Sequence, residues 1–364
     1  MAAKKTGISR DLIIHPGETI ADVLEERGIT QAELAAHTGV SSAYISNVIS
    51  GKKDISTKFA MGLEYALGVP KSFWLNLQAN YDAELLELTE EQTITEEENQ
   101  AYSVLGEVIS YLRKKGDIPS KQDKEGTILS LRKALKISNI ANLRNLVPEG
   151  SFRLATKTAV DPYVLGAWLR LCQNLGESNK ISTSFDINKT EELIAEIKKI
   201  MLKAQCNLQY ELTHLMAQYG IDFAVVRNFK GAPVHGYISQ KKDGIFQMTL
   251  TIRGSFADIF WFSLFHEIGH IVNGDVSKGA KFIDALDHQD MAKEQAADRF
   301  ASSALLDTES YSSFVDKGDF SYSAIRRYAT TQNVMPYVVI GRLQKEKHIP
   351  YTWYSQYKLR YKWA

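Results

Sequence analysis

Two histidines with a glutamate between them interrupt a strongly apolar stretch of the chain. His266, Glu267 and His270 lie within residues 262–274, which read FSLFHEIGHIVNG. Four residues advance an α-helix by about 400°, so both imidazoles would lie on one face, one turn apart. At that spacing both rings can bind one Zn²⁺, and the glutamate reaches a water molecule at the metal without being a ligand. The pattern predicts a zinc site with His266 and His270 as ligands and Glu267 as the catalytic general base.

A catalytic zinc site needs a third protein ligand, which the helical pattern of residues 291–306 offers. Glu294 and Asp298 are four residues apart and would face the same way. Three small or apolar residues continue that face: Ala297, Ala301 and Leu305. We expect Glu294 to be the third ligand, and Asp298 to accept a hydrogen bond from a liganding histidine and orient it. The alternative is a solvated stripe that includes Lys293 and Arg299.

Other candidate residues near this motif have weaker signals. His235, in a β-rich stretch, and His288, in a connecting loop, could face a substrate or be ordinary surface residues, whereas His214 fits a packed helical face. Tyrosines such as Tyr322 are candidates for stabilising an oxyanion, but none is assigned. A peptide would bind along an edge strand, for which residues 246–252, FQMTLTI, are a candidate.

A second functional pattern lies near the N-terminus, in residues 30–52. Thr30 and Glu33 form a capping-box pattern at the start of one helix, and Ser41 can cap the next. Gly39 lies between them, where the turn needs a residue that tolerates positive φ. The residues expected to face inward are Leu34, Ala35, Val40, Ile45 and Val48. This is the spacing of a helix-turn-helix.

The second helix of a helix-turn-helix enters the major groove of DNA. Its outward residues would be Ser42, Tyr44, Ser46 and Asn47. Gln31 would lie by a phosphate, and Lys52, Lys53 and Lys58 follow the second helix, where a backbone contact would fall. The alternative is a helical bundle for dimerisation or docking, because residues 1–81 carry eight basic and eight acidic side chains.

Residues 15–82 resemble the antitoxin-type repressors of the HigA group, within the phage-repressor-like family. The matching stretches are HPGETIADVLEERGITQAELA, ISGKKDIS and LGVPKSFWLNLQANYD. The resemblance implies a five-helix domain that forms a homodimer and binds an operator in double-stranded DNA. It also suggests a toxin partner, which no residue pattern demonstrates.

The sequence HEIGH together with EQAADRFASSALL resembles the ImmA/IrrE family of zinc-dependent peptidases, over residues 208–306. The resemblance implies an α+β zincin-like fold in which His266, His270 and Glu294 bind zinc and Glu267 is catalytic. The family commonly has Glu-Ala-Asn where this chain has Ala-Ala-Asp at 296–298, and Met-Pro where this chain continues with Asp307. Residues 151–173 also look like the connector in proteins that fuse a repressor domain to this peptidase domain.

The pattern along the 364 residues predicts a multidomain chain. We expect an all-α helix-turn-helix domain at 1–82, an acidic linker and helical connector at 83–204, and an α+β zincin-like domain at 205–364. Residues 81–98 contain no Lys or Arg and should form a solvated helix end followed by a linker. Helical periodicity dominates from 99 to 204, and short β-rich runs begin after 205.

Composition limits location more than partners. Net charge is zero, so it does not indicate a partner class. No stretch is long and apolar enough to span a bilayer, and the N-terminus has no secretory pattern. Cys172 and Cys206 are far apart and are expected to be buried thiols in a reducing compartment. We therefore expect a cytoplasmic protein.

The last residues, 351–364, alternate aromatic and basic side chains. One interpretation is a surface that contacts nucleic acid or a partner, because aromatic faces stack on bases. The other is a last strand or helix that packs on the preceding domain with its charges outside.

The sequence as a whole predicts a DNA-binding transcriptional regulator that carries a zinc-dependent metalloendopeptidase domain. Its substrate would be a regulatory protein such as a repressor or antitoxin. The alternative is a non-catalytic repressor or antitoxin whose zinc domain binds a partner or senses a signal. The operator, the substrate and the activating signal do not follow from the residues.

Overall fold

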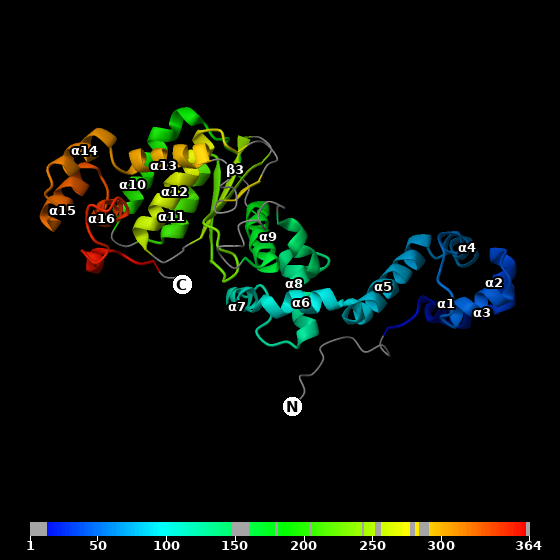
Figure 1. Ribbon diagram of the computed structural model, residues 1–364. Helices are drawn as coiled ribbons and strands as arrows, with labels where there is room; N and C mark the ends of the chain where they lie inside the picture. The colour runs from blue at the N-terminus through cyan, green and yellow to red at the C-terminus, as the bar shows by residue number, and fades with distance from the viewer. Residues whose placement is uncertain are drawn as a thin grey trace. The chain divides into compact units, whose positions relative to one another are not determined.

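The computed structural model describes residues 13–147, 160–178, 181–203, 206–241, 244–251, 256–276, 281–283 and 291–361. These residues are mostly helical, with one small sheet (Figure 1). They divide into two compact units, residues up to 96 with 121–129, and residues 97–120 with 130 onward. No helix within the described ranges combines the length and apolarity needed to cross a bilayer.

The N-terminal unit, blue to cyan in Figure 1, contains the five helices that the resemblance implied. They are α1 (Pro16–Arg27), α2 (Gln31–Thr38), α3 (Ser42–Ile49), α4 (Thr57–Leu67) and α5 (Lys71–Thr89), followed by the 3₁₀ turn η2 (Glu90–Thr93). Thr30 and Glu33 form the predicted capping box, and Gly39 ends α2 at φ 70°. Gly17 brings α1 against α3, because a β-carbon there would overlap the Val48 carbonyl.

Apolar residues from all five helices form the core of this unit. Leu34, Ile45 and Val48 are fully buried, as the sequence predicted. Trp74 of α5 is also fully buried, so the last helix closes the bundle.

Several helices precede the sheet: α6 (Glu96–Val104), α7 (Gly106–Lys115), α8 (Lys124–Leu135), η3 (Ile140–Leu146), α9 (Pro162–Ser178), η5 (Ile187–Lys189) and α10 (Thr190–Met201). The acidic stretch 81–98 is not solvated throughout, contrary to the prediction. Glu98 is fully buried, pairs with Arg132 at 2.5 Å and accepts a hydrogen bond from the Ile140 amide at 3.0 Å. A buried carboxylate requires such partners, and both come from later in the chain.

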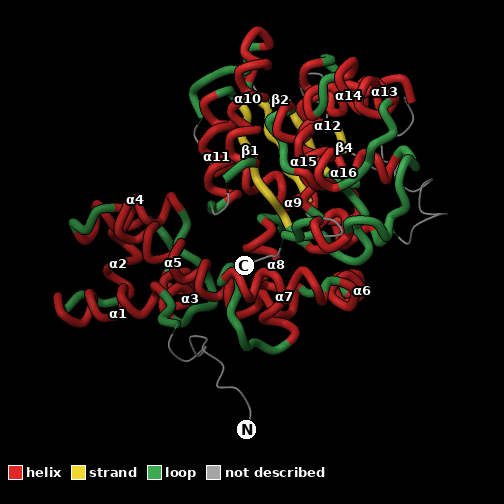
Figure 2. The backbone as a smooth tube through the Cα atoms, turned by 90° about the vertical axis from the view of Figure 1, so that its left-hand side faces the viewer, coloured by secondary structure: helices red, strands yellow, loops and turns green. Residues whose placement is uncertain are grey.

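The sheet, yellow in Figure 2, follows α11 (Leu208–Gln218). Its strands are β1 (Ile221–Val226), β2 (Gly236–Gln240), β3 (Phe246–Thr251) and β4 (Lys281–Ile283). Their order in the sheet is β1-β3-β2-β4. β1 and β3 are parallel, and the other pairs are antiparallel. Because β3 lies between β1 and β2, the expectation that it is an edge strand is wrong.

The two faces of the sheet pack against different helices. Met248 and Leu250 of β3 share a core with α12 (Ala257–Val272). Gln247 points to the other face, where its amide donates to the Cys172 carbonyl of α9. Gly176 of α9 leaves no room for a β-carbon beside Gln247, so this contact is close. Cys172 is a buried thiol as predicted, whereas Cys206 is exposed, so that part of the expectation is wrong.

The chain continues with α13 (Met291–Leu305), α14 (Thr308–Asp316), α15 (Tyr322–Thr331), α16 (Pro336–Lys345) and the 3₁₀ turn η7 (Ser355–Tyr357). The tail packs on α12: Arg360 forms a β-bridge with Phe256, and the Trp261 indole donates to the Tyr361 hydroxyl at 2.9 Å. Packing was one of the two interpretations, but Lys358 points inward to Asp258 rather than outward.

Candidate metal centre and DNA-contact surface

Helix α12 carries both motif histidines into a buried position. His266 and His270 are 7% and 0% exposed, and their Nε2 atoms lie 3.0 Å apart. Their spacing of four residues gives them the same face, as the sequence predicted. Two ring nitrogens this close in an apolar environment need a shared partner to offset the cost of their burial.

Helix α13 brings Glu294 to the same point. Its carboxylate oxygens lie 3.3 Å from His266 Nε2 and 3.5 Å from His270 Nε2, and the three candidate ligand atoms are all within 4.8 Å of one another. The helices approach closely because Gly269 lacks a side chain; a β-carbon there would lie 3.1 Å from Ala297 Cα. The small residue Ala297 on α13 lies at this point of close approach between the two helices.

The outer nitrogens of both rings are held by carboxylates. His266 Nδ1 lies 3.0 Å from Asp298, and this hydrogen bond holds the pKa of Asp298 below its ordinary value. His270 Nδ1 lies 2.9 Å from Asp275, whose side chain is 8% exposed. With both Nδ1 atoms bonded to carboxylates, the two Nε2 atoms face Glu294, and two imidazoles with one carboxylate are a donor set that fits Zn²⁺.

Asp275 was missed by the sequence interpretation. It follows Gly274, whose φ of 76° ends the turn after α12, and its amide donates to the His270 carbonyl at 3.0 Å. A Gly-Asp pair directly after a helix with two histidines in its last turns is the signal that could have identified it.

Glu267 lies on the sheet side of α12 and is fully buried. A β-carbon at Gly236 would overlap its carboxylate, so the start of β2 is shaped around this side chain. Glu267 directly follows His266 in the chain but is not part of the three-residue cluster, and its carboxylate lies against the start of β2.

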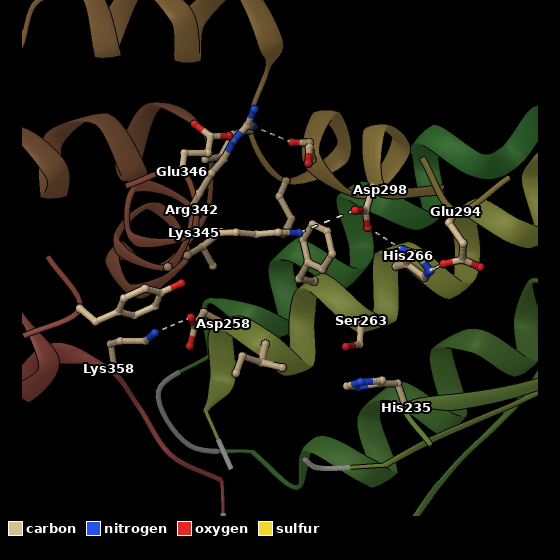
Figure 3. A pocket seen from close by; sticks show the side chains of 18 residues that line it. His235, Asp258, Ser263, His266, Glu294, Asp298, Arg342, Lys345, Glu346 and Lys358 are labelled. Carbon is tan, nitrogen blue, oxygen red and sulfur yellow. Dashed lines mark hydrogen bonds and ion pairs between the residues drawn. The ribbon is translucent and has the colours of Figure 1, made fainter. Parts of the chain in front are cut away.

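A cavity of about 710 Å³ opens beside the cluster (Figure 3). Its floor is the face of α12 from Asp258 to His266, and α13 and α16 form a wall. His235, which directly precedes β2, also lines it. Tyr322 is not among the lining residues; its ring stacks on Tyr357 at 3.9 Å. His288 lies outside the described residues.

His214 does not pack as expected. It is exposed on α11, and its ring lies 4.7 Å from that of Tyr210, which is 60% exposed. The two rings cover each other at the surface, so His214 has no place in the site.

The predicted DNA contacts are exposed with one exception. The exposed ones are Gln31, Ser42, Ser46, Asn47, Lys52 and Lys53. Tyr44 is half-buried, because its ring packs edge-on against Phe59 at 5.1 Å and lies 4.3 Å below the Lys53 ammonium. The outward position of Tyr44 stays a prediction, and its ring also supports the surface that carries Lys53.

The α2–turn–α3 arrangement has the geometry of a helix-turn-helix, and residues 20–74 match the helix-turn-helix family model. The N-terminal unit thus contains a helix-turn-helix domain, the class of fold that DNA-binding regulators use.

Individual relatives each match about a fifth of the chain. Virulence-associated protein A′ of Dichelobacter nodosus is 42% identical over 69 residues, which are 19% of this chain and 60% of that protein. The chain therefore spans less than two thirds of the length of this curated relative. An antidote protein of a plasmid maintenance system from Nostoc punctiforme is 39% identical, over 22% of this chain and 87% of that one, with a TM-score of 0.21. Pseudomonas aeruginosa antitoxin HigA, solved with the higBA promoter, is 32% identical over 22% of this chain and 89% of that one, also with a TM-score of 0.21.

Proposed function

We propose that this chain is a DNA-binding regulator that carries a zinc-dependent endopeptidase in a zincin-like α+β domain. One observation carries the enzymatic part: the Nε2 atoms of His266 and His270 meet the Glu294 carboxylate while Asp298 and Asp275 bind the outer nitrogens. The cavity offers a substrate access to the cluster, and we propose Glu267, which directly follows His266, as the general base.

Each residue has a defined task in peptide hydrolysis. Bound zinc would supply a Lewis acid that polarises the peptide carbonyl. Glu267 takes a proton from the attacking water and delivers it to the leaving amine, so that water is added across the broken C–N bond. The burial of Glu267 against Gly236 fixes the carboxylate in place, and the two Asp–His hydrogen bonds fix the ring orientations.

The sheet offers an edge strand to which a peptide substrate could bind. Among the described strands, β4 lies at the edge of the sheet beyond β2, and its Ile283 pairs with Tyr237, the neighbour of Gly236. An extended peptide could add to this edge, whose adjacent strand β2 begins at the glycine that Glu267 contacts. We propose this edge in place of β3.

The helix-turn-helix domain supports operator binding as the second activity. In this proposal Asn47 and Ser46 of α3 contact base edges, and Gln31, Lys52 and Lys53 contact phosphates. A repressor or antitoxin as peptidase substrate, a toxin partner, a homodimer and action in the cytoplasm are parts of the same proposal.

The decisive experiment is Glu267→Gln in the full-length chain, with the exposed Glu309→Gln as a matched control. The zinc content should be unchanged in both, because neither residue is in the metal cluster. Protein fragments that appear in cells with the wild type and with Glu309→Gln should be lost with Glu267→Gln. Identical fragments in all three strains, with zinc bound, would favour the non-catalytic repressor or antitoxin instead.

A further inference from the structure

The cavity beyond the metal cluster contains charged groups that are already paired. Three acid–base pairs line it, at 2.6, 3.0 and 3.8 Å: Asp258 with Lys358, Glu346 with Arg342, and Asp298 with Lys345. The pair formed by Asp258 and Lys358 closes the end opposite the cluster; its side chains are 11% and 10% exposed. Lys358 also donates to Gln344 at 3.2 Å.

The floor between this end and the cluster is apolar. Ile259 is 41% exposed although it lies inside the cavity, and Phe262 follows it on the same face of α12. His266 comes seven residues after Ile259 and four after Phe262, so these side chains lie about 6–10 Å along the helix from the liganding rings. Val338 of α16 and Leu305 of α13 provide apolar surface on the wall.

This lining discriminates between side chains by their charge. A lysine or glutamate side chain that entered would lose hydration and meet counter-charges that are already bound to each other. A leucine or phenylalanine side chain would instead remove the exposed surface of Ile259 from water. The cavity is continuous with the cluster, since His266 and Glu294 also line it, so its occupant must be a part of the substrate close to the reacting bond.

We infer that this cavity is the specificity site of the peptidase, and that it takes a large uncharged side chain next to the bond that is cleaved. Ile259 and Phe262 determine the preference for apolar side chains, and the loss of hydration on entry disfavours charged ones. The inference rests on the proposed peptidase function, but it concerns which substrate binds rather than whether cleavage follows.

Binding of metal-directed probes tests the inference without requiring turnover. Zinc-loaded full-length protein would be titrated calorimetrically with dipeptide hydroxamates that carry Ala, Leu, Phe, Lys or Glu beside the hydroxamate, the group that binds the metal. The Phe and Leu probes should bind at least about tenfold more tightly than the Ala probe, because they fill apolar surface. The Lys and Glu probes should bind no more tightly than Ala.

The variant Ile259→Asp adds a carboxylate to the apolar floor of the cavity. It should weaken the Phe probe at least about tenfold and make the Lys probe the better ligand of the two. Ile187→Asp is the matched control, since Ile187 is 55% exposed and does not line the cavity; it should leave the order of the probes unchanged.

Equal affinities for the Ala and Phe probes, or the same order of probes in wild type and Ile259→Asp, would overturn the inference. A failure of the proposed function would be visible separately, as an absence of zinc or as identical fragments with Glu267→Gln. The two failures can therefore be told apart.

Discussion

The two units place their polar functional residues in opposite surroundings. In the N-terminal unit Gln31, Ser46 and Asn47 are exposed above an apolar core. In the C-terminal unit His266, Glu267 and His270 are buried inside the apolar helix α12. The first group can satisfy its hydrogen bonds with water until a partner arrives, whereas the second depends on groups fixed within the fold.

This difference determines how each site should respond to change. Exposed residues act one at a time, so single substitutions should have modest and additive effects. Buried polar residues that share partners act as a unit, so the loss of one leaves others without partners and costs more. The predictions below test this contrast, in order of decreasing effect.

Glu294→Ala should have the largest effect, because it removes the carboxylate that lies near both Nε2 atoms. Zinc affinity should fall by more than about 100-fold, beyond the range expected for an orienting residue. Competition with a chromogenic chelator measures this loss. Operator binding by the same variant should be unchanged, and a protein that keeps zinc at wild-type affinity would contradict the assignment.

Gly236→Ala should separate catalysis from metal binding. The added methyl group would displace the Glu267 carboxylate, and a misplacement of this size costs up to about 100-fold in rate. Zinc content should be unaffected. Gly106→Ala is a suitable control, since nothing lies within 4 Å of the added carbon. Equal rates of peptide cleavage in the two variants would show that the Glu267 position is not critical.

The two orienting aspartates should differ in importance. Asp275→Ala should lower zinc affinity by about 10- to 100-fold, because Nδ1 of the fully buried His270 loses its partner. Asp298→Ala should cost less, since the Asp298 side chain is 49% exposed and water can replace it. The same chelator competition ranks the two variants. If Asp298→Ala lowered zinc affinity more than Asp275→Ala, the burial of the aspartate would not determine the size of the loss.

The N-terminal unit should show smaller, separable effects. Asn47→Ala should weaken binding to the cognate operator by about 1–3 kcal/mol and relax specificity at one base position. Lys53→Ala should weaken binding to all DNA sequences. It should also reduce the slope of log binding constant against log salt concentration by about 1. Fluorescence anisotropy at several salt concentrations distinguishes them. If both variants lost only specificity, the assignment of Lys53 to a phosphate would be wrong.

Alkaline pH should destabilise the C-terminal unit gradually. Burial raises the pKa of Tyr337 and of Tyr361 above the ordinary 10.0, and both hydroxyls accept from the Trp261 indole. The unfolded chain therefore loses protons first, and the free energy of unfolding should fall as pH rises above 10.0. Urea unfolding at increasing pH measures the slope, which Tyr337→Phe should reduce.

The sequence predicted the features that depend on local spacing. Helical periodicity alone placed His266 and His270 on one face and Glu294 with Asp298 on another, and the structure brings these faces together. The capping box at Thr30 and the turn at Gly39 are also local, and both are present.

The remaining features depend on contacts between distant segments, which periodicity does not contain. Glu98 can be buried because Arg132, from another helix, pairs with its carboxylate. β3 is an interior strand because β1 and β2 lie on either side of it. Tyr44 is half-buried because its ring packs against that of Phe59, which comes from another helix. Asp275 was missed because it lies beyond the end of α12, where helical spacing no longer applies.

The close fit between α9 and the sheet has a consequence for how such a chain could be divided. A protein fragment that started at residue 205 would lack the Cys172 carbonyl, which accepts a hydrogen bond from the Gln247 amide. It would also expose the face of the sheet that α9 covers. Such a fragment should aggregate, whereas one that began before Pro162 would keep this face covered. Exchange of regulatory domains between relatives would therefore need its junction upstream of α9.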